Sequence, residues 1–151
     1  MTATLLAEQS DSMVTPQSVL EEVFGYQEFR DGQLEAIEYA VKGQDSLVIM
    51  PTGGGKSLCY QIPALVRSGL TLVISPLISL MKDQVDQLKA NGVAAECVNS
   101  TLSREELISV YNRMHSGALK LVYVSPERVL MRDFIERLES LPLSMIAVDE
   151  A

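Results

Sequence analysis

A run of glycines followed by a lysine and a serine has the residue types and spacing of a phosphate-binding loop. Gly53–Gly55 allow a tight turn in which several backbone amides point at one anion. Lys56 supplies a positive charge for phosphates, and the Ser57 hydroxyl is suited to ligate Mg²⁺. The general form of this loop has Gly where this chain has Met50. A glycine-rich turn with a chance lysine is the alternative. The nucleotide-binding residues expected here are Thr52, Gly53, Gly54, Gly55, Lys56 and Ser57.

A pair of acidic residues near the end of the chain could supply a carboxylate ligand for Mg²⁺ and a general base, which a phosphate-binding loop itself does not contain. Asp149 and Glu150 directly follow an apolar run. Asp149 is suited to hold Mg²⁺, and Glu150 is suited to polarise the water that attacks a phosphate. Two acids after a strand are often only a solvated loop, and the phosphate-binding loop on the same sheet is what favours catalysis.

The elements that must position these residues alternate between strands and helices. Continuous apolar runs are typical of parallel strands buried on both faces. They predict strands at Leu47–Met50, Leu70–Ile74, Leu121–Val124 and Met145–Val148, with Val93–Val98 as a weaker candidate. Helices are expected at Ser18–Phe24 after a Thr15-Pro16 cap, and at Gly32–Lys42, Ile78–Lys89, Arg104–His115 and Val129–Leu138. Ser103 and Glu106 have capping-box spacing. The alternation predicts an α/β fold with an open parallel sheet.

The conspicuous polar residues follow strands, and ligands of such sheets bind beyond the carboxyl ends of the strands. All of them are therefore expected along one rim of the sheet. They are the phosphate-binding loop, Ser75-Pro76, Ser125–Arg128 and Asp149-Glu150.

Composition sets limits on the class of protein. The 151 residues are 47% hydrophobic and 21% charged, which is typical of a globular domain. Twelve Lys and Arg against twenty Asp and Glu leave a net charge of −8, so any contact with nucleic acid must be local. Cys59 and Cys97 have no ligand-type spacing, which favours reduced thiols over zinc or a disulfide framework. With no apolar stretch of membrane length and no signal-peptide pattern, a cytoplasmic location is expected.

Several motifs resemble those of the RecQ family of DNA helicases. Met50–Ala64 resembles motif I of that family, and Ile74–Val85 resembles motif Ia. Asp149 to Ala151 resemble the first three letters of its Asp-Glu-Ala-His box. Phe24-Gly25-Tyr26, Phe29-Arg30 and Gln33 resemble motif 0, which binds adenine. The likeness runs from about Val19 to the last residue.

The resemblance implies roles in recognising the base. Gln33 would read adenine through its amide, Tyr26 would stack on the base, and Arg30 would support the pocket. Without the family, the aromatic residues here would be ordinary core residues, and for Phe24 and Phe29 that interpretation stays open.

The resemblance also implies contacts to single-stranded DNA. Hydroxyl groups and free amides at a helix start bind phosphate without much net charge. A Ser-Pro helix entry with no ligand is the alternative. The residues concerned are Ser75, Pro76, Ser125, Pro126 and Arg128.

Over the whole chain, the resemblance implies a truncated RecA-like P-loop NTPase lobe with helices on both faces of the sheet. Residues 1–14 would be a flexible N-terminus, and 15–151 the first half of the N-terminal RecA-like ATP-binding domain. A complete protein would use ATP and Mg²⁺ to move 3′ to 5′ on single-stranded 3′ tails and duplex junctions. An arginine finger in a second lobe and a zinc-binding region would lie beyond these residues, so the chain alone would not unwind DNA.

The resemblance further implies a role in DNA recombination, repair and the SOS response, a location at the nucleoid, and single-stranded DNA-binding protein as a partner. An RNA helicase of the same superfamily and a non-translocating ATP-binding switch are the alternatives.

Overall fold

A four-stranded parallel sheet forms the centre of the computed structural model, which describes residues 13–51 and 55–150. Its strands lie in the order β2-β3-β1-β4, and every neighbouring pair is parallel. The side chains of the two central strands are almost entirely buried, as continuous apolar runs predict. The strands are β1 Leu70–Ile74, β2 Ala95–Val98, β3 Leu121–Val124 and β4 Leu143–Val148.

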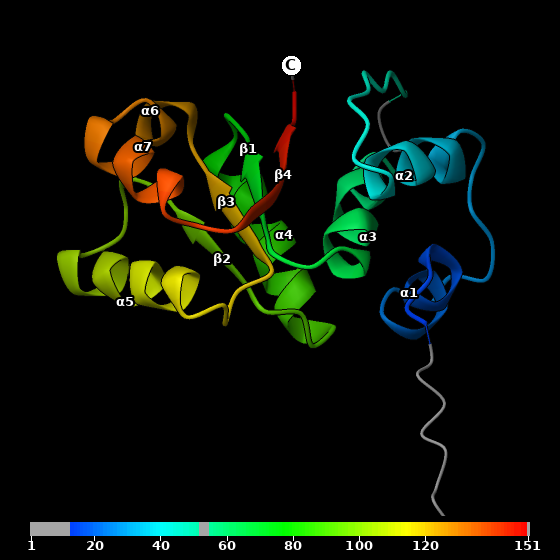
Figure 1. Cartoon of the computed structure of the whole chain (residues 1–151), viewed down its shortest axis with the longest axis horizontal. Helices are drawn as coiled ribbons and strands as arrows, with labels where there is room; N and C mark the ends of the chain where they lie inside the picture. The colour runs from blue at the N-terminus through cyan, green and yellow to red at the C-terminus, as the bar shows by residue number, and fades with distance from the viewer. Residues whose placement is uncertain (1–12, 52–54, 151) are drawn as a thin grey trace, which may run out of the picture.

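Helices cover both faces of this sheet (Figure 1). On one face, α3 and α4 pack against residues of β1, β2 and β3. On the other face, α5 and α7 pack against the same sheet. A separate small core joins α1, α2 and α3. The helices are α1 Pro16–Glu22, α2 Gln33–Val41, α3 Leu58–Val66, α4 Ile78–Ala90, α5 Arg104–His115, α6 Pro126–Val129 and α7 Arg132–Glu139.

The predicted open parallel sheet with helices on both faces is therefore confirmed. Local signals placed several helix ends well. The Ser103 hydroxyl accepts from the Glu106 amide at 3.1 Å, and the Glu106 carboxylate accepts from the Ser103 amide at 2.9 Å. This capping box starts α5 at the predicted residue. None of the helices in the described ranges is long and apolar enough to cross a bilayer.

Two predicted elements were wrong. Leu47–Met50 is not a strand: the segment has no regular structure, and Leu47 and Ile49 are 82% and 87% exposed. Its apolar composition suits a strand, but a strand forms only where the segment pairs with a neighbour, and in the described residues a groove separates residues 44–50 from the edge of β4. The single helix expected at Val129–Leu138 is two helices: α6 begins at Pro126, a residue suited to the first turn, and ends at Val129, and α7 begins at Arg132.

The edge of the sheet faces this unpaired segment. Among the described residues, β4 pairs only with β1, so its outer edge is open there, and Ile146 on this strand is 55% exposed. A groove of about 880 Å³ separates residues 44–50 from residues 143–150. The sheet as described therefore ends in an unpaired, partly apolar edge strand.

Candidate functional site

One cavity of about 690 Å³ gathers the residues that the sequence assigns to nucleotide binding. They come from the loop after α1, from the start of α2 and α3, and from the segment after β4. Those lining the cavity are Tyr26, Arg30, Gln33, Gly55, Lys56, Ser57, Asp149 and Glu150. Thr52, Gly53 and Gly54, assigned to the same site, lie outside the described residues, as do residues 1–12 of the expected flexible N-terminus and Ala151.

Gln33 links the predicted base-binding end of the cavity to the phosphate-binding loop. Its side chain is only 2% exposed. Its Oε1 accepts from the backbone amide of Arg30 at 2.7 Å, and its Nε2 donates to the backbone carbonyl of Gly55 at 3.1 Å. A glutamine amide has two N–H donors and two acceptor lone pairs, so one of each is left for a ligand. Tyr26, by contrast, is 55% exposed at the cavity wall, as a ring awaiting a stacking partner would be.

The end of the phosphate-binding loop is held in a conformation that favours glycine. Gly55 has φ +77°, and a side chain there would collide with the Gln33 amide. Ser57 is the N-cap of α3, yet its hydroxyl makes no capping hydrogen bond. That oxygen is therefore positioned at a helix N-terminus and is not used by the helix itself, which fits a metal ligand beside an anion.

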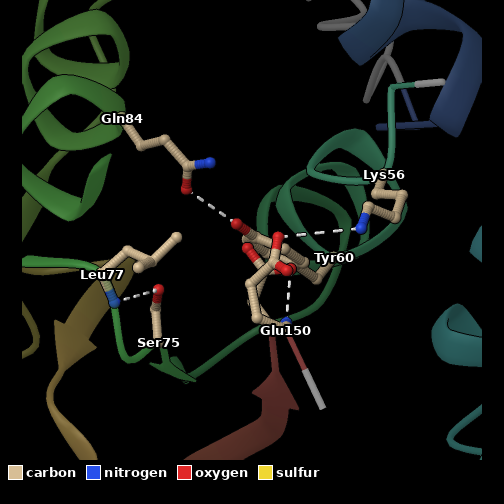
Figure 2. Close-up of polar contacts among 7 residues, drawn as sticks. Lys56, Tyr60, Ser75, Leu77, Gln84 and Glu150 are labelled. Carbon is tan, nitrogen blue, oxygen red and sulfur yellow. Dashed lines mark hydrogen bonds and ion pairs between the residues drawn. The ribbon is translucent and has the colours of Figure 1, made fainter. Parts of the chain in front are cut away.

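The acidic pair lies opposite Lys56. The Asp149 amide donates to the Ile74 carbonyl at 2.9 Å, which extends the pairing of β1 and β4 by one residue and fixes the acidic pair at the rim of the sheet. Glu150 has φ +58°, an uncommon conformation for a residue with a side chain. Its Oε1 lies 3.8 Å from Lys56 Nζ. Figure 2 marks this ion pair with a dashed line. Both side chains are partly exposed, so this is a weak ion pair that an incoming phosphate can replace.

The strand-end residues assigned to DNA do not line the cavity, but they share its rim of the sheet. Ser75 donates its backbone amide to the Val124 carbonyl at 3.1 Å, and Ser125 donates to the Val98 carbonyl at 3.4 Å. The Ser75 hydroxyl accepts weakly from the Leu77 amide at 3.5 Å. The Ser125 hydroxyl accepts from the Arg128 amide at 3.3 Å and caps α6.

These contacts match the helix-entry alternative in part. Both serines are buried, whereas Pro76 is exposed and Pro126 and Arg128 are partly exposed. Pro76 and Arg128 are therefore more accessible to a ligand than the hydroxyls of the two buried serines.

Sequence reasoning missed a connected set of polar side chains at the cavity, of which Gln61, Tyr60 and Tyr123 are buried and Gln84 is partly exposed. Gln61 donates to the Tyr123 hydroxyl at 2.9 Å, Tyr123 donates to the Tyr60 hydroxyl at 3.4 Å, and Tyr60 donates to Gln84 Oε1 at 2.8 Å. We call these four side chains the buried polar chain. The only signal in the sequence was the polar character of Gln61 and Gln84 within motifs I and Ia, and their partners are too distant along the chain to be inferred from spacing.

Tyr60 and Tyr123, the two tyrosines of the buried polar chain, stay neutral. Burial raises the pKa of the Tyr60 hydroxyl strongly, and the neighbouring Tyr123 hydroxyl and the Asp149 carboxylate act in the same direction. Burial likewise raises the pKa of Tyr123, and the charge of Asp149 adds to that effect. Both hydroxyls therefore remain protonated, and act as hydrogen-bond donors, at neutral pH.

Comparison with known proteins adds two findings. The model of the DEAD/DEAH box helicase family matches residues 30–151. The chain is 59% identical over 137 residues to the ATP-dependent DNA helicase RecQ of Haemophilus influenzae, which covers 91% of this chain and 22% of that protein. It is 52% identical over 136 residues to the RecQ protein of Bacillus subtilis, covering 89% and 23%. The rat ATP-dependent DNA helicase Q1 is 46% identical over 139 residues, covering 87% and 22%. The chain thus spans less than a quarter of the length of these relatives.

Proposed function

Because the chain belongs to the DEAD/DEAH box helicase family, we propose that it is the ATP-binding part of the first motor lobe of a RecQ-type DNA helicase. The proposal rests on one cavity that is lined both by the residues expected to bind adenine and by the residues expected to bind phosphate and metal. The first group is Tyr26, Arg30 and Gln33, and the second is Lys56, Ser57, Asp149 and Glu150. The RecQ proteins of two bacteria, more than half identical to this chain, support the DNA-directed subclass.

At the phosphate end, each side chain has a distinct role. Lys56 exchanges its weak pairing with Glu150 for the β and γ phosphates. Ser57 and Asp149 are oxygen donors facing the same cavity, so they fit Mg²⁺ and would hold it; when bound, the ion neutralises charge on the phosphate oxygens. Glu150, released from Lys56, orients a water molecule and accepts its proton during attack on the γ-phosphate.

At the base end, Gln33 uses its remaining N–H and lone pair to pair with the edge of adenine. Tyr26 stacks on the ring, and Arg30 borders the same end of the cavity. Because the Gln33 amide also donates to Gly55, occupancy of the base pocket and the conformation of the phosphate-binding loop are linked directly.

In the whole protein, we propose that Ser75, Pro76, Ser125, Pro126 and Arg128 border a path for single-stranded DNA. Because the net charge of the chain is −8, DNA would not be attracted by bulk charge. The proposed binding therefore relies on local contacts from helix-start amides and Arg128. This proposal includes movement 3′ to 5′ on DNA with 3′ tails or junctions and work in recombination and repair. It also includes contact with single-stranded DNA-binding protein and a place at the cytoplasmic nucleoid.

Hydrolysis and unwinding by these residues alone are expected to be slow, since an arginine finger raises such rates by about 10³–10⁵-fold.

The test is calorimetric titration of the chain with Mg-ADP and with Mg-GDP, with circular dichroism to show that it is folded. The proposal expects ADP binding that is lost in Lys56→Ala and absent for GDP. If the folded protein binds neither nucleotide, the phosphate-binding roles are contradicted. If it binds ADP and GDP equally, the base-recognition roles are contradicted.

A further inference from the structure

The buried polar chain joins three elements that meet the proposed ligands at different places. Tyr60 lies in the first turn of α3, the helix whose N-cap is Ser57. Tyr123 lies near the end of β3, just before Ser125. Gln84 lies on α4, the helix that follows Ser75 and Pro76, and its side chain also borders the nucleotide cavity. Figure 2 draws the Tyr60–Gln84 hydrogen bond and the Lys56–Glu150 ion pair in one view.

The hydrogen bonds of the buried polar chain are continuous and all run in one direction. Each tyrosine hydroxyl accepts one hydrogen bond and donates the next, so the donors run from Gln61 through Tyr123 and Tyr60 to Gln84. Hydrogen bonds arranged in series polarise one another. The two rings also meet edge to face, with centroids 6.2 Å apart. Tyr60 and Tyr123 are at most 9% exposed, so a hydroxyl left without its partner has no ready access to water.

Such an arrangement resists independent movement of the three elements. A shift of α3 that breaks the Tyr60–Gln84 contact leaves a buried donor unpaired, which costs about 1–3 kcal/mol. Moving α3 and α4 together avoids that cost.

We infer that Tyr60 is a positioning residue that couples occupancy of the nucleotide cavity to the strand-end loops after β1 and β3, through its hydrogen bonds to Gln84 and Tyr123. This inference rests on the proposed function, because it needs a nucleotide at one end and single-stranded DNA at the other. Tyr60 touches neither ligand. It transmits between them by making the position of α3 dependent on the positions of α4 and β3.

The experiment measures coupling in the full-length protein. The Kd for fluorescent Mg-ADP is determined with and without a saturating oligo-dT strand, in the wild type and in Tyr60→Phe, Gln84→Met and the double variant. Phenylalanine keeps the ring and removes only the hydroxyl. The ratio of the two Kd values is the coupling factor, and it is the same for either ligand by thermodynamic reciprocity.

The matched control is Val85→Ala. Val85 is the next residue on α4, is buried in the core under that helix, and takes no part in the buried polar chain. Its truncation weakens packing of the same helix without removing a hydrogen bond. The coupling factor is therefore expected to stay at the wild-type value in Val85→Ala.

The wild type is expected to show a coupling factor of about 5 or more, within the usual range for linked sites. Tyr60→Phe and Gln84→Met should each bring it to within about twofold of 1, and the double variant should lose no more than either single variant. A wild-type factor retained in Tyr60→Phe, or lost equally in Val85→Ala, overturns the inference and leaves the proposed function standing. Absence of ADP binding in the wild type overturns the proposed function, and the inference with it.

Discussion

The side-chain amide of Gln33 donates a hydrogen bond to the backbone carbonyl of Gly55 across 3.1 Å, which ties the predicted base pocket to the last glycine of the phosphate-binding loop. The contact joins residues 22 positions apart, and it is made by a side chain that is 2% exposed. The position of Gly55 in the loop thus depends on the residue that we propose reads the base.

Gly55→Ala is expected to abolish ADP binding and to destabilise the chain. The left-handed backbone at φ +77° costs about 1–2 kcal/mol for a residue with a side chain, and the new methyl group would displace the Gln33 amide. Gly92→Ala is the matched control, since Gly92 has φ +82° and a methyl group added there would meet nothing within 4 Å. Urea unfolding and calorimetry of both variants separate the two effects. ADP affinity equal in the two variants would refute the role of the Gln33 contact.

Glu150→Gln is expected to slow ATP hydrolysis by the full-length protein by about 10²–10⁴-fold, the usual worth of a general base. Mg-ATP affinity should stay equal or rise, because the change removes a negative charge that lies 3.8 Å from Lys56 Nζ. Steady-state hydrolysis and equilibrium binding measure the two quantities. Glu139→Gln, at the exposed last residue of α7, is the control. A variant that hydrolyses ATP normally would exclude Glu150 as the base.

Ser125→Ala tests whether the cap of α6 serves DNA binding. Loss of a capping hydroxyl costs about 0.5–2 kcal/mol, and Ser103→Ala removes a comparable cap from α5. Both variants should lower the free energy of unfolding. Only Ser125→Ala should weaken binding of single-stranded DNA, because its hydroxyl holds the Arg128 amide at 3.3 Å. Fluorescence anisotropy with oligo-dT measures the DNA affinity of each variant. Equal affinity in both variants would show that Ser125 is only a structural cap.

The open edge of β4 is expected to cause self-association of the 151-residue chain. Ile146 is 55% exposed on a strand that pairs on one side only, and charged residues on such edges block further pairing. Ile146→Lys should therefore shift sedimentation velocity profiles toward monomer. Ile108→Lys, at a 47% exposed position on α5, makes the same chemical change away from the edge. If both variants act alike, general surface hydrophobicity and not the β4 edge drives association.

Local sequence signals were sufficient where the structure is decided locally. The Ser103–Glu106 capping box predicted the start of α5, since helix hydrogen bonds are made within the segment. Continuous apolar runs placed β1 and β3 at the predicted residues. The glycine, lysine and serine types of the phosphate-binding loop and the acidic pair determined which chemistry is available, because that chemistry belongs to the side chains themselves.

Tertiary structure decided what depends on partners distant in the chain. Leu47–Met50 has the composition of a strand, but a strand's hydrogen bonds lie between segments, so composition alone does not form one. The contact between Tyr60 and Tyr123 joins residues 63 positions apart, and no spacing rule predicts it. The same holds for the cavity, where Gln33, Lys56 and Glu150 meet only because the parallel sheet and α3 bring their separate segments to one rim.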